Sequence, residues 1–443
     1  MTDEAAGTVK NRGWTVVFAG LGINLALGVL YSWSIISAEI ARTDWAWASS
    51  AADRALPYSV ACLVFCLIMV PAGRMQDKLS PMIVASIGGV LVGLGMVLAS
   101  IMDAGSSNMG YVLGFGVLAG AGIGFGYASA TPPAVKWFPK AKTGMIAGLV
   151  VCGFGLASVY IAPLSKKLAT TYGLETMMMS LGIGFLVIVV GLAQLLKTPP
   201  AGYVPEGEVS AAPVAAGTMV KKEDFLPSEM LRTWQFYMTW FMYACGAGAG
   251  LMVISCCKKI VAGAGIAENM AVAAVMGLAI GNGAGRVVAG MLSDKLGRNK
   301  TMLLFFLLQA GAIFGLSVAS TVESPSGVLL VVLAGLVGAN YGSNLALFPS
   351  ITKDYFGLKN FGMNYGLVFT AWGIGGFVLA QFAAKVFDGK IVESWGGSYK
   401  FAFYTSAALL VVAAVLTFVL KAPHHEEAAE GEEGAAPAPA PGA

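Results

Sequence analysis

The chain contains twelve apolar stretches of about twenty residues, separated by short polar connections. Each stretch can cross the roughly 30 Å hydrocarbon core of a bilayer as one helix, which needs about 20 residues. Lipid offers no hydrogen-bond partner to an open backbone, so such segments must be helical. The sequence therefore predicts an all-α integral membrane protein with twelve transmembrane helices. The expected spans are residues 14–38, 55–76, 81–102, 109–133, 142–165, 175–196, 234–257, 268–293, 300–320, 326–350, 360–386 and 398–421.

Composition excludes a soluble protein. Charged residues make up 12% of the chain and hydrophobic residues 57%, whereas a soluble domain has about 25% charged residues. A net charge of +3 gives no reason to expect a nucleic-acid partner. The six cysteines lie in or beside apolar stretches, and the two histidines lie in the polar C-terminal tail. We therefore expect a lipid bilayer around the protein, and no metal site, disulfide or cofactor.

Two compositional breaks divide the chain. Residues 197–233 are rich in Pro, Ala, Gly and charge, which predicts a cytoplasmic linker. The linker separates an N-terminal six-helix bundle, residues 1–196, from a C-terminal six-helix bundle, residues 234–421. Residues 422–443 form an acidic, low-complexity tail that we expect to be disordered.

Lysine and arginine predict the orientation. With the N-terminus inside, 17 of these cations fall on the inner side and nine on the outer side. The positive-inside rule then places both termini in the cytoplasm. A multi-pass protein of the plasma or inner membrane is expected.

The two halves repeat one another. GRMQDKLSP begins at Gly73 and GMLSDKLGR at Gly290, a separation of 217 residues. GMIAGL begins at Gly144 and GMNYGL at Gly362, a separation of 218 residues. A duplicated six-helix unit explains the common offset and predicts two pseudo-symmetric bundles with a binding site between them, near the bilayer midplane.

The repeated segments carry a family resemblance. GMLSDKLGRNKTM (290–302) and its weaker partner GRMQDKLSP (73–81) resemble the loop signature of the major facilitator superfamily. The resemblance implies a gating role for Asp77, Asp294 and Arg298, in which acids receive cations and a helix N-terminus while the inner gate is closed. The alternative is ordinary cytosolic loop charge.

Within that superfamily the chain is similar to the oxalate/formate antiporter and monocarboxylate porter group. The supporting stretches are YSW at 31–33, KWFP at 136–139, EMLRTWQFY at 229–237, ALFPSITKDYFG at 346–357 and NYG at 364–366. The similarity implies a secondary transporter of small carboxylates.

Arg286 is the most informative single residue. It lies between apolar or small residues for two turns on each side, where an arginine costs at least about 2.5–3.5 kcal/mol. Its planar, permanently charged guanidinium fits a carboxylate bidentately. The alternative is a structural ion pair, but the sequence places no acid well inside any span. A substrate anion is the favoured partner.

Two neighbouring positions bear on charge. Asn282 lies one turn before Arg286 on the same helix face. The animal monocarboxylate carriers of the resembled group have an aspartate there, tied to proton coupling, and asparagine cannot titrate. The oxalate transporter of the group has a second cation at the position that aligns with Trp372. One fixed cation favours a monoanion such as lactate over oxalate.

Aromatic residues complete the expected site. By the same resemblance Tyr31, Tyr127, Tyr341 and Phe369 match positions that line the family's cavity. The 218-residue repeat pairs Phe154 with Trp372, and Asn344 is a further polar candidate. Tyrosine hydroxyls can hold an oxygen of the substrate while the rings exclude water.

The expected function is proton-coupled uptake of small monocarboxylates by alternating access, by a protein that works as a monomer. Carboxylate exchange of the oxalate/formate kind is the alternative, and a receptor that binds an organic acid without carrying it is another. No Ser–His pair or intramembrane acid pair supports an enzyme. Glu39, Asp44 and Asp53 near the outer mouth are interpreted as solvated loop charges rather than proton carriers.

Overall fold

The computed structural model describes residues 11–102, 104–139, 143–200, 203, 205, 224–357 and 360–423, and for residues 77, 78, 143 and 144 it describes the backbone alone. All regular elements in these ranges are helical. The predicted tail, His424 and His425 within it, and most of the predicted linker lie outside the described residues.

The N-terminal half begins with α1 (Gly13–Leu27), a 3-10 turn η1 (Gly28–Ser32) and α2 (Trp33–Ile40), which run on as one rod. It continues with α3 (Ala51–Lys78), α4 (Pro81–Ile101), α5 (Met109–Tyr111), the π-helical η2 (Val112–Ala119), α6 (Gly120–Val135), α7 (Thr143–Leu156) and α8 (Ser158–Ala193).

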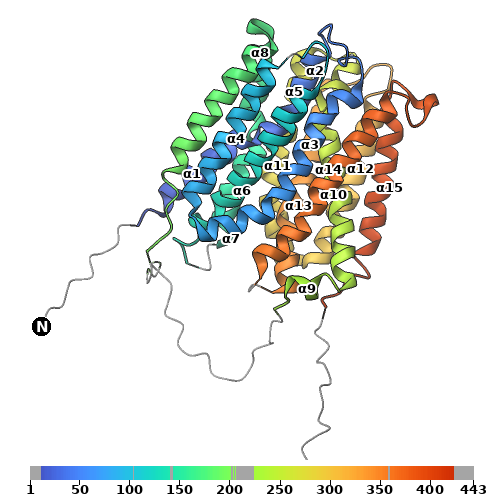
Figure 1. The fold of residues 1–443 in the computed structure, drawn as a ribbon. Helices are drawn as coiled ribbons and strands as arrows, with labels where there is room; N and C mark the ends of the chain where they lie inside the picture. The colour runs from blue at the N-terminus through green and yellow to red at the C-terminus, as the bar shows by residue number, and fades with distance from the viewer. Residues whose placement is uncertain are drawn as a thin grey trace, which may run out of the picture.

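The C-terminal half begins with the short α9 (Pro227–Met230). It continues with α10 (Trp234–Gly263), α11 (Glu268–Leu296), α12 (Arg298–Ala319), α13 (Gly327–Phe356), α14 (Phe361–Phe387), the 3-10 turn η4 (Glu393–Trp395) and α15 (Lys400–Leu416). Figure 1 shows the two halves side by side, with α9 at the same end of the bundle as α7.

Ten helical runs of the described chain are long and apolar enough to cross a membrane, and Lys400–Leu416 is a shorter apolar helix. One run, Met145–Ala193, has 49 residues, about 70 Å at 1.5 Å per residue and more than twice a bilayer core. Gly173 interrupts it with a φ of 85°, a left-handed conformation that glycine adopts without steric cost. The protein is therefore a multi-pass, all-helical membrane protein.

Several predicted boundaries were wrong. The first span is not a uniform α-helix, because η1 interrupts it at Gly28–Ser32. The predicted span 142–165 is broken at Ala157, where α7 ends and α8 begins. Residues 224–233 of the predicted linker pack on the C-terminal half. The amide of Phe225 donates to the carbonyl of Phe356 at 3.1 Å, and Asn364 donates to the carbonyl of Phe225 at 3.0 Å.

Glycines bring α11 and α13 into backbone contact. A Cβ at Gly281 would collide with the carbonyl oxygen of Gly335, and one at Gly285 with that of Ala339. Close approach of small residues is how helices associate without a hydrophobic driving force in lipid. These glycines therefore serve packing, and the packing fixes the face of α11 that carries Asn282 and Arg286.

We call the end of the bundle that carries α2, α5 and the turn of α8 the distal end, and the opposite end, with α7 and α9, the near end (Figure 1). The chain enters α1 at the near end and reaches the distal end at α2.

Candidate functional site

Arg286 lies on α11 and reaches across to the other half. It is 5% exposed, and its Nη1 donates to the backbone carbonyl of Val151 on α7 at 3.0 Å. Its Nε and Nη2 both donate to Oδ1 of Asn282 at 3.2 Å. All three acceptors are neutral. Among the described residues, no carboxylate lies within ion-pair distance of the guanidinium.

Asn282 presents a second unused donor beside Arg286. The residue is fully buried, its Oδ1 is occupied by the guanidinium, and its Nδ2 has no hydrogen-bond partner. Gly155 of α7 faces this amide, and a Cβ there would lie 3.4 Å from Nδ2. An unpaired buried amide N–H is unfavourable by about 1–3 kcal/mol. The pair of residues is therefore arranged to donate to an acceptor that the protein itself does not supply.

A hydrogen-bonded chain of three aromatic residues lies beside this pair. The hydroxyls of Tyr31 on η1 and Tyr341 on α13 lie 2.6 Å apart, and Trp372 Nε1 on α14 donates to the Tyr341 hydroxyl at 2.8 Å. All three side chains are at most 2% exposed. Together with Tyr127 on α6, Tyr31 and Tyr341 lie close enough to Arg286 to interact with its charge.

The predicted aromatic positions converge on one ring that the sequence reasoning missed, Phe65 of α3. Its centroid lies 5.8 Å from Phe154, 5.6 Å from Phe369, 5.0 Å from Trp372 and 5.4 Å from Tyr127. Phe369 also stacks on Trp372, with centroids 5.1 Å apart. We call this group the aromatic cage; its members are Tyr31, Phe65, Tyr127, Phe154, Tyr341, Phe369 and Trp372.

Two further tyrosines border the cage. Tyr243 of α10 and Tyr365 of α14 both pack against Phe369, with centroids 6.2 and 5.7 Å apart. The sequence offered a partial signal for Tyr365, which belongs to the NYG stretch. Tyr243 and Phe65 lie in unmarked apolar runs, so only the fold identifies them. Tyr127 and Tyr365 are half-buried, whereas Tyr31, Tyr341 and Trp372 are closed off from solvent.

Asn344 is not brought to this group by its own bonds. Its Nδ2 donates to Gln309 Oε1 at 3.4 Å and to the carbonyl of Asn340 at 3.0 Å. Both contacts lie inside the C-terminal half.

The predicted gating residues lie at the near end. Arg298 donates to Asp294 at 2.8 Å and to Asp354 at 2.9 Å, so it joins α12 to the ends of α11 and α13. All three residues belong to the C-terminal half. The side chain of Asp77 lies outside the described residues.

The distal end carries a buried ion pair between the halves. Lys258 Nζ of α10 lies 2.5 Å from Glu39 Oε1 of α2, and the two side chains are 2% and 7% exposed. Glu268 of α11 joins them, 3.4 Å from Lys258 and 2.8 Å from Arg42. The interpretation of Glu39 as a solvated loop charge was wrong, because the halves meet over this end and exclude water from it.

Asp388, just beyond α14, makes a second distal contact. Its carboxylate accepts from the backbone amides of Ala51 and Ala52 at 2.8 and 2.9 Å and from the Ser50 hydroxyl at 3.0 Å. It therefore caps the N-terminus of α3 in the other half. Burial alone would raise the pKa of this carboxyl, but the three donors outweigh it and hold the pKa below its ordinary value.

Comparisons with known proteins agree with this architecture. A sequence model of the family described as Major Facilitator Superfamily matches residues 13–380 and, in an overlapping second match, residues 260–442. The chain is 26% identical to an oxalate:formate antiporter of Oxalobacter formigenes over 95% of this chain and 94% of that protein. It is 25% identical to monocarboxylate transporter 11 of Mus musculus over 85% and 82%.

The fold is shared with a solved structure. The xylose transporter XylE of Escherichia coli, in a partially occluded inward-open conformation, superposes with a TM-score of 0.64 at 13% identity, covering 92% of this chain and 99% of XylE. The family match spans the described helices of both halves, and the relatives include members of the group that the sequence resembles. The chain therefore belongs to the major facilitator superfamily.

Proposed function

We propose that the protein is a secondary active transporter of small monocarboxylates, with L-lactate as the type of substrate, and that it works by alternating access. The proposal includes twelve spans, with Met145–Ala193 crossing twice, in two six-helix bundles formed by residues 1–196 and 234–421. Both termini are placed in the cytoplasm, and the protein is taken to work as a monomer in the plasma or inner membrane.

One observation carries this proposal: Arg286 is buried at the junction of the halves with neutral partners only. A guanidinium in a dry cavity is costly unless an anion neutralises it. A carboxylate that arrives there lowers the free energy of the closed, water-excluding state. Binding and closure are thereby linked, as alternating access requires.

The donors suit a carboxylate. The guanidinium has five N–H groups in a planar fork, and the unpartnered Nδ2 of Asn282 lies beside it. One carboxylate oxygen can therefore accept from Arg286 and the other from Arg286 or Asn282. The cage rings cover the short apolar tail, and the hydroxyls of Tyr31 and Tyr341 are available to a 2-hydroxyl group.

The cage favours a monoanion. Trp372 occupies the position where the oxalate transporter of the resembled group has a second cation, and its indole is fully buried against Phe369 and the Tyr341 hydroxyl. A second carboxylate of a dianion would face these groups without a counter-ion, which is unfavourable in a low-dielectric site.

Access to the cage supports a conformation that is closed at the distal end. Glu39–Lys258 and the Asp388 cap join the halves there. The half-buried Tyr127 and Tyr365 mark the side of the cage from which solvent approaches. In the opposite conformation the distal contacts separate, and the near ends of the halves, with Asp77, Asp294 and Arg298 as gating groups, come together.

Coupling to protons is one form of this proposal and exchange is the other. Co-transport of one proton with one monocarboxylate is electroneutral, but Asn282 does not titrate and the proton carrier is unassigned. Exchange of one carboxylate for another is the function named for the Oxalobacter formigenes relative, and it needs no proton carrier.

The test is uptake of labelled L-lactate, formate and oxalate into proteoliposomes containing the purified protein. Symport predicts that an inward proton gradient accelerates L-lactate uptake into empty vesicles. Exchange predicts uptake only into vesicles preloaded with a carboxylate, without a response to the gradient. A protein that binds L-lactate but moves none of the three acids under either condition is a receptor, and the transport proposal is then wrong.

A further inference from the structure

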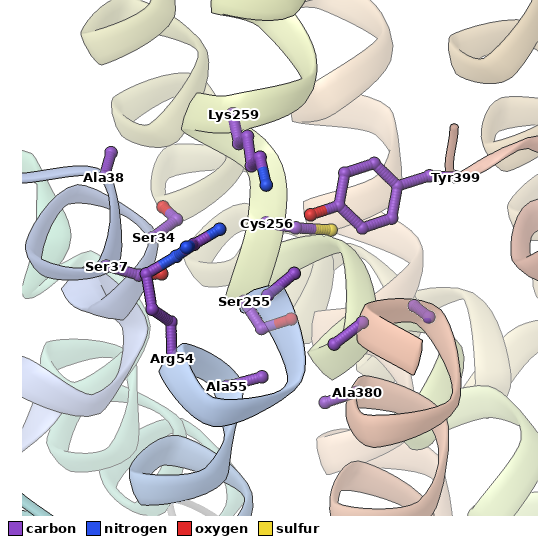
Figure 2. A pocket seen from close by; sticks show the side chains of 13 residues that line it. Ser34, Ser37, Ala38, Arg54, Ala55, Ser255, Cys256, Lys259, Ala380 and Tyr399 are labelled. Carbon is purple, nitrogen blue, oxygen red and sulfur yellow. The ribbon is translucent and has the colours of Figure 1, made fainter. Parts of the chain in front are cut away.

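A second cavity lies between the halves at the distal end. Figure 2 shows Arg54 and Lys259 pointing toward one another across it, with the hydroxyl of Tyr399 also directed into it. The remaining lining consists of small side chains from α2, α3, α10 and α14; they are Ser34, Ser37, Ala38, Ala51, Ala55, Ser255, Cys256, Ala380, Ala383 and Ala384.

The two cations of this distal cavity lack an acidic partner. Arg54 of the N-terminal half is 3% exposed, and its guanidinium donates to the backbone carbonyl of Ala48. Lys259 of the C-terminal half is half-buried, and its Nζ lies 3.6 Å from the centroid of the Phe387 ring. Neither forms an ion pair with any residue that the structure describes. The nearby Asp388 is committed to the N-terminus of α3.

A third group points to a missing ligand. Ser34 is 2% exposed, and its hydroxyl has no hydrogen-bond partner in the structure. Two facing cations and an unpaired buried hydroxyl form a set of donors without an acceptor. The alanines beside them leave an apolar wall. Donors on one side and methyl groups on the other match a carboxylate with a short alkyl tail.

The cavity lies on the same helix faces as the aromatic cage. Ser34 follows Tyr31 by three residues, and Ala380 follows Trp372 by eight, so each pair shares a helix face. On α3 the 11 residues from Arg54 to Phe65 correspond to about 16 Å. The path between them is closed by contacts of α3 with the C-terminal half: Tyr58 donates to the carbonyl of Leu251 at 3.0 Å, and Gly373 packs against Cys66.

We propose that the distal cavity is a second carboxylate site, where Arg54 of one half and Lys259 of the other hold the transported acid before it reaches Arg286 from the distal side. This inference rests on the proposed transport of carboxylates. An anion between the two cations contacts both halves and offsets their mutual repulsion, so its arrival also favours closure of the distal end.

The test compares Arg54→Gln and Lys259→Gln with Lys167→Gln, which removes an exposed charge at the same end and away from the cavity. Initial rates of L-lactate uptake are measured in right-side-out and inside-out vesicles. Each cavity variant is expected to raise KM about tenfold for entry from the distal side, since a hydrogen bond to a charged group is lost. KM for entry from the near side stays within twofold of the wild type, and Lys167→Gln leaves both values unchanged.

Binding to the cavity is measured separately in Arg286→Gln, which lacks the central cation. Saturation-transfer NMR is expected to detect L-lactate on this variant, to lose the signal in Arg286→Gln/Arg54→Gln, and to keep it in Arg286→Gln/Lys167→Gln. Size-exclusion elution identifies any variant that fails to fold, and Lys259→Gln then replaces Arg54→Gln.

The inference is overturned if wild type and both cavity variants share one KM from the distal side, or if chloride at equal concentration removes the NMR signal, which would make the cavity an inorganic-anion site. Failure of the proposed function is distinct, because the wild-type protein would then take up no carboxylate from either side.

Discussion

The hydroxyls of Tyr31 and Tyr341 lie 2.6 Å apart and join the two halves of the protein at the level of the aromatic cage. The Tyr341 hydroxyl also accepts from Trp372, so one oxygen organises three buried aromatic side chains from η1, α13 and α14.

Tyr341→Phe is expected to destabilise the protein. The change leaves the buried Trp372 Nε1 and the Tyr31 hydroxyl without a partner, which costs about 1–3 kcal/mol. Thermal unfolding in detergent measures the loss. Tyr111→Phe is the matched control, because that buried hydroxyl has no hydrogen-bond partner to lose. Equal melting temperatures for the two variants would contradict the role of the hydroxyl chain.

Trp372→Lys is expected to move selectivity toward dicarboxylates. The new ammonium would lie in a buried position, where a second carboxylate group offsets its cost. The ratio of oxalate to L-lactate uptake should rise about tenfold, the effect of one charged hydrogen bond. Trp372→Met removes the ring without adding charge and should leave the ratio near its wild-type value. A ratio that rises equally in both variants would assign the effect to cage volume.

Glu39→Gln is expected to open the distal end. It leaves the buried Lys258 with the longer, half-exposed contact to Glu268, and an incompletely paired buried charge is strongly unfavourable. Labelling of Cys256, which is 7% exposed beside the distal cavity, should accelerate with a hydrophilic thiol reagent. Mass spectrometry of the Cys256 peptide measures the rate. Glu175→Gln, an exposed acid at the same end, is the control. Unchanged labelling in Glu39→Gln would show that the pair does not hold the halves together.

Asp388→Asn is expected to weaken distal closure by the same amount from about pH 5 to pH 8. The native pKa of Asp388 is held below its ordinary value of 3.8. The stabilisation by its carboxylate is therefore complete above 3.8 and is lost only as the pH falls through the lower native value. The ratio of Cys256 labelling rates, variant to wild type, should exceed one and stay constant over this range. A ratio that falls to one near pH 5 would mean that the carboxyl is already protonated there.

The helical spans and the lone cation were predictable because both follow from local sequence. Apolar length identifies a membrane helix, and Arg286 is conspicuous in an apolar run without acids. The repeat offset paired Phe154 with Trp372, and both rings contact Phe65. The superfamily resemblance is confirmed by the family match.

The polar contacts between the halves were not predictable. Glu39, Arg54, Lys258 and Lys259 stand at helix ends, where a sequence alone does not separate a solvated charge from one that the other half covers. Their burial depends on how the halves meet, which is a relation between positions more than 200 residues apart, such as Glu39 and Lys258. For the same reason the hydrogen bond between Tyr31 and Tyr341 required the fold.

The central claim is that Arg286 binds the carboxylate, and labelled L-lactate uptake by Arg286→Gln proteoliposomes tests it most directly. We expect uptake to fall about a hundredfold or more, since two charged hydrogen bonds are lost, while size-exclusion elution and Tm stay near wild type. Arg232→Gln, an exposed arginine at the near end, should retain full uptake. Uptake by folded Arg286→Gln at close to the wild-type rate would contradict the claim.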